Sequence, residues 1–114
     1  MKVLIVAPDR DLLDSLRGLL ILCGMEADAA HDGVMAIEKS RAASYGAALV
    51  DAKTPLIRAG DLIKEFGASG TPAILMTEDA EARGEGILRY PFTPEELLAA
   101  IEKTAGEKGD AKDE

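Results

Sequence analysis

Residues 47–51 read AALVD, four apolar side chains followed by a carboxylate. Two more short apolar runs, at residues 3–6 and 73–76, have the same character. Short runs without polar alternation are typical of strands that are buried on both faces of a parallel sheet. A brief run at residues 87–88 predicts a further strand. A more dilute stretch at residues 25–30 predicts a strand at a sheet edge.

Helical patterns separate these strands. The first begins after Asp9, a suitable N-cap, and stops before Gly24, and its apolar face includes Cys23, which we expect in the core. Further helices are expected at about residues 33–43, at about residues 60–66 and after Thr93, which opens a capping box with Glu96. Alternating strands and helices predict an α/β domain with parallel strands, right-handed crossovers and helices on both faces.

Two segments depart from this alternation. Residues 78–86 provide nine positions, whereas a crossover between parallel strands usually takes roughly ten residues or more. We therefore expect the helix between the fourth and fifth strands to be shortened or missing. Residues 105–114 are polar and charged without apolar periodicity, which predicts a disordered tail after a folded domain of residues 1–104.

The composition limits the partners and the compartment. The chain has 114 residues, enough for one domain, and a formal net charge of −8. Such an acidic surface repels nucleic acid and anionic lipid, so neither is expected as a partner. A single cysteine indicates a reducing compartment, and the apolar start is too short for a signal peptide or a membrane span. We expect a cytoplasmic protein.

Several motifs stand in order along residues 2–104. They are Lys2–Val6, Asp11-Leu-Leu13, Ala30-His-Asp-Gly33, Leu49-Val-Asp51 with Pro55, Pro72–Thr77 and Pro91–Leu98. The ordered set resembles the receiver domains of response regulators, which have a chemotaxis-regulator-like fold. This resemblance implies a doubly wound, flavodoxin-like sheet of five parallel strands in the order 2-1-3-4-5. It also implies a role in two-component or phosphorelay signalling.

In that family an aspartate at the position of Asp51 accepts a phosphoryl group from a histidine kinase. The family's magnesium ion is held by two acidic residues after the first strand, and here those positions are Ala7 and Pro8. Neither has a side-chain oxygen. Asp9 follows, but capping the first helix is its expected role. Asp9 and Asp51 would form at most a weak magnesium site, so we expect no cofactor and no metal.

A second departure concerns the positive charge of the family site. Its lysine, which pairs with the phosphoryl group, is replaced by Tyr90, whose phenol is neutral at pH 7. The adjacent Arg89 should face the other way along the strand. We hypothesise that Lys53 or Arg58 screens Asp51 in place of a metal. The simpler alternative is that both are solvated loop cations.

The switching residues also differ from the family pattern. Thr77 matches the family's switch hydroxyl, but its aromatic partner falls at Ile87, which has no polar ring to move. His31 is expected in the turn before the second helix, and the peptide bond between Tyr90 and Pro91 is a candidate for the cis form. The first strand–helix turn lacks a glycine-rich loop, which argues against a dinucleotide-binding enzyme.

Together these features favour a stand-alone pseudo-receiver that is not an enzyme and acts by docking a protein. The expected partner is a histidine kinase or an output protein, and a homodimer is compatible with the sequence. With no output domain in the sequence, any output would be made in trans. Two alternatives remain: a functional single-domain response regulator phosphorylated on Asp51, and a flavodoxin-like domain that binds a small molecule.

Overall fold

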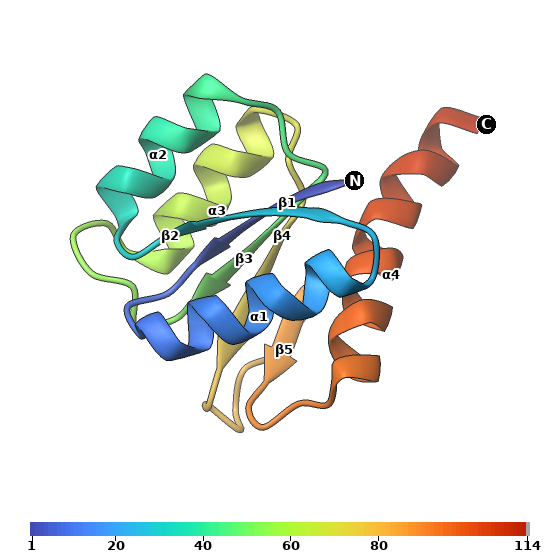
Figure 1. Ribbon diagram of the computed structural model, residues 1–114. Helices are drawn as coiled ribbons and strands as arrows, with labels where there is room; N and C mark the ends of the chain where they lie inside the picture. Colours follow the sequence, from blue (N-terminus) through green and yellow to red (C-terminus); the bar gives the residue numbers. More distant parts are fainter. Residues whose placement is uncertain (114) are drawn as a thin grey trace.

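The computed structural model describes the backbone of residues 1–113 and the side chains of residues 1–105. Five parallel strands form one sheet in the order β2-β1-β3-β4-β5 (Figure 1). The strands are β1 (Lys2–Val6), β2 (Glu26–Ala30), β3 (Ala47–Asp51), β4 (Ala73–Thr77) and β5 (Ile87–Arg89). The helices are α1 (Arg10–Leu22), α2 (Gly33–Ala42), α3 (Ala59–Ala68) and α4 (Pro94–Asp113). This arrangement confirms the expected doubly wound fold and its strand order.

The sheet is covered by helices on both faces. Helices α1 and α4 pack on one face, and α2 and α3 pack on the other (Figure 1). Successive residues of β1 point to opposite faces, so Val3 and Ile5 join the first core, whereas Leu4 and Val6 join the second. All four side chains are fully buried. Burial on both faces is the reason that the central strands are apolar except at Lys2, Asp51 and Thr77, which lie at strand ends.

Helix α1 begins as expected and ends earlier than its apolar pattern indicates. Asp9 is its N-cap, and the Asp9 carboxylate accepts hydrogen bonds from two backbone N–H groups of the first turn, at 2.9 and 3.2 Å. Cys23 is the C-cap and is exposed, so its expected place in the core is wrong. The chain leaves the helix there because Gly24 follows with a φ of 86°. Cys23 therefore lies past the end of the buried helical face.

The start of α2 packs tightly against the loop that follows β3. Asp32 caps α2 by accepting a 2.7 Å hydrogen bond from a backbone N–H of the first turn. His31 lies in the turn as expected, with Nδ1 3.3 Å from the Asp32 carboxylate. A Cβ atom at Gly33 would lie only 2.5 Å from the Cβ of Ile57. The Gly33 N–H also donates to the Pro55 carbonyl at 3.0 Å, so the loop is held against the helix.

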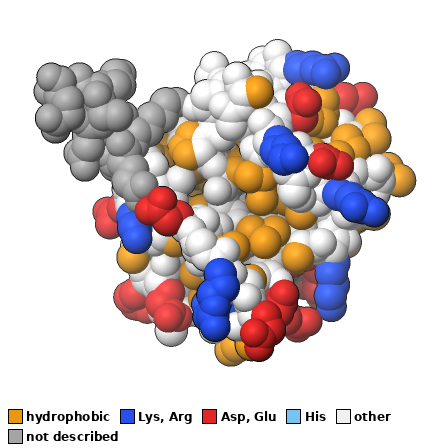
Figure 2. Space-filling view, turned by 180° about the vertical axis from the view of Figure 1, so that it is seen from behind, with side chains coloured by type: hydrophobic (Ala, Val, Ile, Leu, Met, Phe, Trp, Pro, Cys, Tyr) orange, Lys and Arg blue, Asp and Glu red, His pale blue; other side chains and the backbone are white. Residues whose placement is uncertain are grey.

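Residues 78–86 form turns and bends, with no helix between β4 and β5 in the described backbone. The Arg89 guanidinium donates to two backbone carbonyls of this segment and holds it at the end of β5. On the sheet, Leu75 and Ile87 are neighbours in register, and both remain half-buried. Figure 2 shows apolar side chains on the back of the molecule, among charges of both signs. The shortened connection confirms the expectation drawn from its length.

The last helix carries the chain out of the domain. Thr93 and Glu96 form the expected capping box, with hydrogen bonds of 3.0 and 2.8 Å. The predicted disordered tail, residues 105–114, lies outside the residues whose side chains are described, apart from Ala105. Among the described helices, none combines the length and the apolar character that a membrane span requires.

Candidate functional site

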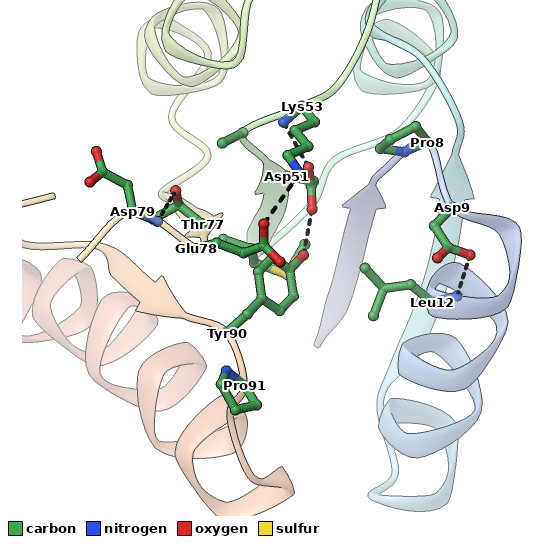
Figure 3. Close-up of a pocket in the computed structure, with 12 residues that line it drawn as sticks. Pro8, Asp9, Leu12, Asp51, Lys53, Thr77, Glu78, Asp79, Tyr90 and Pro91 are labelled. Carbon is green, nitrogen blue, oxygen red and sulfur yellow. Dashed lines mark hydrogen bonds and ion pairs between the residues drawn. The ribbon is translucent and has the colours of Figure 1, made fainter. Parts of the chain in front are cut away.

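A hollow of about 550 Å³ opens at the edge of the sheet where the strands end (Figure 3). Folds of this type commonly bind their ligands at this edge. The side chains and backbone groups that matter here belong to Asp9, Asp51, Lys53, Thr77, Glu78 and Tyr90. The structure therefore brings together most of the residues that the sequence singled out.

Asp51 is the last residue of β3, and only 8% of it is exposed. One carboxylate oxygen, Oδ1, accepts a 2.7 Å hydrogen bond from the backbone N–H of Lys53. The other, Oδ2, accepts a 2.5 Å hydrogen bond from the Tyr90 hydroxyl. The Thr54 hydroxyl donates to the Asp51 carbonyl at 2.7 Å and fixes the turn that follows the strand. Both oxygens of the buried carboxylate thus already have a partner.

Tyr90 is held in place by the residues around it. Its backbone N–H donates to the Thr77 carbonyl at 2.9 Å, and the peptide bond to Pro91 is cis, as expected. Its ring stacks on Phe92 with centroids 5.3 Å apart. Burial raises the pKa of the Tyr90 phenol above its ordinary value, and the hydrogen bond to Asp51 raises this pKa further. The phenol therefore stays protonated and acts as a neutral hydrogen-bond donor.

The side of the hollow next to β1 has few oxygen ligands. Ala7 is fully buried and Pro8 is exposed, and neither carries a side-chain oxygen. Asp9 lines the hollow, but its Oδ1 is bonded to the first turn of α1. No group of three or more His, Cys, Asp or Glu in the described residues could hold a metal ion. The side of the hollow next to β1 therefore offers fewer side-chain oxygens to a divalent ion than the family pattern does.

The two proposed charge screens do not reach Asp51. The Lys53 ammonium pairs with Glu78 at 3.2 Å, and both side chains are largely exposed (76% and 70%). Lys53 contacts Asp51 through its backbone N–H instead. Arg58 is the N-cap of α3 and does not line the hollow. Among the described residues neither cation forms an ion pair with Asp51, and Glu78 offers Lys53 an exposed partner that needs no desolvation.

Comparisons with known proteins agree with this geometry. No family model matches the chain. It is 32% identical over 114 residues to the transcriptional regulatory protein CpxR homolog of Haemophilus influenzae, covering 88% of this chain and 48% of that protein. It is 28% identical over 112 residues to the response regulator MprA of Mycobacterium avium, covering 89% and 49%. A CheY-like receiver domain from Methanospirillum hungatei matches with a TM-score of 0.86 and 24% identity, over 96% of this chain and 97% of that one.

The chain has the fold of a receiver domain. The chemotaxis response regulator CheY4 of Vibrio cholerae shares its fold with a TM-score of 0.82 and 23% identity, over 90% of this chain and 97% of that one. This receiver spans about half the length of the curated relatives it matches. The family resemblance read from the ordered motifs is thus confirmed. The low identities agree with the departures at Ala7, Pro8 and Tyr90.

Thr77 lines the hollow, whereas two other positions considered in the sequence, Ile87 and Arg89, do not. Thr77 is buried, and its hydroxyl oxygen accepts a 3.1 Å hydrogen bond from the N–H of Asp79, which fixes the turn after β4. Ile87 lies at the start of β5 and does not line the hollow. Arg89 does not line the hollow, and its guanidinium bonds to the 78–86 segment.

The bond between Tyr90 and Asp51 is the feature of this receiver that the sequence did not reveal. The sequence predicts a neutral donor at Tyr90 but indicates no partner for its hydroxyl. The position itself carried a signal, since the family's lysine at this place reaches the phosphoryl group on the aspartate. A tyrosine has comparable reach, so its hydroxyl can meet the carboxylate directly.

Proposed function

We propose that this receiver is a signalling module of a two-component or phosphorelay system that docks protein partners, with little or no magnesium-dependent phosphorylation of Asp51. The signalling context is supported by its curated relatives, which are named as response regulators and a transcriptional regulatory protein. Docking is supported by the acidic balance of the chain, a net charge of −8, which complements a partner with a basic surface.

The occupied carboxylate of Asp51 carries the proposal. To attack a phosphoryl donor, Oδ2 must first release the Tyr90 hydroxyl, which it holds at 2.5 Å. The phosphoryl group would then stand beside a neutral phenol where the family has an ammonium, so its negative charge would be poorly compensated. Ala7 and Pro8 add no oxygen to bind a divalent ion. The bound hydroxyl, the missing ammonium and the missing oxygens each disfavour the transfer of a phosphoryl group to Asp51.

The test is incubation with acetyl phosphate and Mg²⁺, followed by intact-mass measurement. We expect little or no phosphoryl adduct on the natural sequence. A matched variant, Ala7→Asp/Pro8→Asp/Tyr90→Lys, restores the family's carboxylates and ammonium and should gain the adduct. Adding Asp51→Asn to this variant should remove it again. A stoichiometric adduct on Asp51 of the unmodified receiver would overturn the proposal.

A receiver that is still phosphorylated on Asp51 is the second candidate. It is favoured by the presence of a carboxylate at the end of β3 in an open hollow, with Asp9 lining the same hollow. In this case Asp9 and water would complete the magnesium coordination. Magnesium titration followed by NMR separates the two: saturable binding at about millimolar concentration or below, lost in Asp51→Asn, would favour the second candidate.

A further inference from the structure

Tyr90 forms part of the wall of two cavities. One is the hollow of about 550 Å³ beside Asp51. The other is an apolar groove of about 300 Å³ between α1 and the connection from β5 to α4, lined in part by Leu16 and Leu19. Leu12 also borders both cavities. Because Tyr90 lines both spaces, a movement of its ring would change the shape of the hollow and of the groove.

The side chain of Tyr90 has apolar neighbours and one polar partner. Its backbone is fixed, since the Tyr90 N–H donates to the Thr77 carbonyl at 2.9 Å. Among the described residues, the side chain makes one hydrogen bond, the 2.5 Å bond from its hydroxyl to Asp51 (Figure 3). The ring also stacks on Phe92, with an interplanar angle of 25°, and packs against the core between the sheet and helices α1 and α4. The bond to Asp51 is therefore the contact that directs the hydroxyl into the hollow.

We propose that Tyr90 is a two-position side chain that couples the Asp51 hollow to the groove beside α1. While Asp51 is a free carboxylate, the phenol lies in the hollow and the groove is open. When Asp51 loses its acceptor oxygen, or when a group at Asp51 displaces the phenol, the ring turns into the groove. This movement opens the hollow and fills the groove.

The groove suits the ring in its second position. The apolar body of the ring would pack on Leu16 and Leu19, and its hydroxyl could reach water beside the exposed Ser15. In the hollow, by contrast, a half-buried phenol without Asp51 as its acceptor would lose its one hydrogen bond to a side chain of the described residues. The same bond therefore decides between the two positions.

Coupling of this kind acts in both directions. An occupant of the groove would hold the ring against Asp51, and an occupant of the hollow would drive the ring outward, so the two occupants oppose each other through linkage. The inference goes beyond the proposed function, because it holds for any group that displaces the phenol. It stands whether or not Asp51 can be phosphorylated.

The chain contains two tyrosines, which makes fluorotyrosine labelling informative. Tyr45 donates to Asp28 at 2.7 Å at a separate site and serves as the reference. In Asp51→Ala, we expect the fluorine resonance of Tyr90 to shift while that of Tyr45 stays in place. In the matched variant Asp28→Ala, which removes the partner of Tyr45, the opposite pattern is expected.

Nuclear Overhauser contacts to assigned methyl groups establish where the ring lies. In Asp51→Ala, contacts from the Tyr90 ring to Leu16 and Leu19 should strengthen, and contacts to Met76, which lines the hollow, should weaken. Tyr90→Phe should give the same pattern with Asp51 intact, and it replaces the first variant if that variant does not fold. Ring contacts that remain as in the natural sequence in a folded variant would overturn the proposal. The phosphorylation assay has no bearing on this result.

Discussion

A tyrosine where the family has a lysine changes the resting state of the neighbouring carboxylate. A lysine would provide a positive charge to a phosphoryl group, whereas Tyr90 provides one neutral O–H donor. That donor is engaged before any reaction takes place, because its oxygen lies 2.5 Å from Asp51. At the scale of one residue, the substitution both removes a charge and places a hydroxyl on the carboxylate oxygen Oδ2 of Asp51. This is the physical basis for the proposed loss of phosphorylation.

The hydrogen bond itself should stabilise the fold. Tyr90→Phe removes the hydroxyl. The Asp51 carboxylate, in a residue that is only 8% exposed, then keeps one hydrogen bond, which comes from the backbone N–H of Lys53. Hydrogen bonds to buried charged groups are worth about 1–3 kcal/mol, so we expect the free energy of unfolding to fall by that amount. Urea denaturation measures it. No change in the urea midpoint would mean that water replaces the hydroxyl without loss.

Both tyrosines should make the protein sensitive to alkali. Burial first, and a hydrogen bond to a carboxylate second, raise the pKa of Tyr90 and of Tyr45 in the folded chain above the ordinary value of 10.0. The folded state then keeps its phenolic protons to a higher pH than the unfolded state does. The stability linked to these protons is complete below about pH 10 and is lost as the pH rises further.

This predicts that tyrosinate absorbance and loss of the native circular dichroism appear together on alkaline titration. In Tyr90→Phe the dependence of stability on pH above about 10 should be shallower, because only one phenol with a raised pKa, that of Tyr45, remains. Tyrosinate absorbance that develops while the circular dichroism stays native would contradict the raised pKa of both phenols.

At the scale of the elements, one glycine determines how closely the loop after β3 approaches α2. In Gly33→Ala, the new Cβ would lie 2.5 Å from the Cβ of Ile57, and the nearby Ile57 backbone cannot move freely. Overpacking of this kind costs about 1–3 kcal/mol, and urea denaturation should show that loss. The matched control is Gly18→Ala in α1, where nothing lies within 4 Å, and it should stabilise by roughly 0.5–1 kcal/mol. Equal effects of the two substitutions would contradict the tight contact.

The elements were predictable because their causes are local. Strands and helix starts depend on residues that are close in sequence. Examples are the apolar runs at β1, β3 and β4 and the caps at Asp9 and Thr93. Cys23 was misplaced because its spacing fits the helical face, whereas the helix end depends on the conformation of the chain at Gly24. The length of residues 78–86 predicted the missing helix. It could not predict that Arg89 would bond to that segment, since this contact depends on the folded geometry.

For the whole molecule, the sequence located the site better than it described the contacts within it. Strand order brings the ends of β1, β3 and β5 together, so Asp9, Asp51 and Tyr90 were expected near one edge. Which partner each side chain takes is a competition between several nearby groups. Lys53 could have paired with Asp51 or with Glu78, and the exposed pair with Glu78 formed because it leaves both charges in water. The spacing of residues in the sequence does not show how much it would cost to desolvate Lys53 beside Asp51.

The charge of the molecule as a whole gives the last prediction. With a net charge of −8, like charges repel one another in the folded state more than in the expanded chain, and salt screens this repulsion. The ion pairs Lys53–Glu78 and Lys2–Asp28 oppose the effect only weakly, because their side chains are substantially exposed. We expect the urea midpoint to rise as NaCl increases from low concentration to about 0.2 M, where the Debye length falls below about 10 Å.

A charge-reversed variant tests whether net charge is the cause of this salt dependence. Glu81→Lys/Glu85→Lys alters two exposed positions of the 78–86 segment and lowers the net negative charge without touching either ion pair. Its urea midpoint should rise less with salt than that of the natural sequence. A midpoint that falls with salt in both proteins would show that the ion pairs outweigh the repulsion. In that case the repulsion between acidic side chains would lower the free energy of unfolding only slightly. The negative charge could then serve partner binding with little loss of stability.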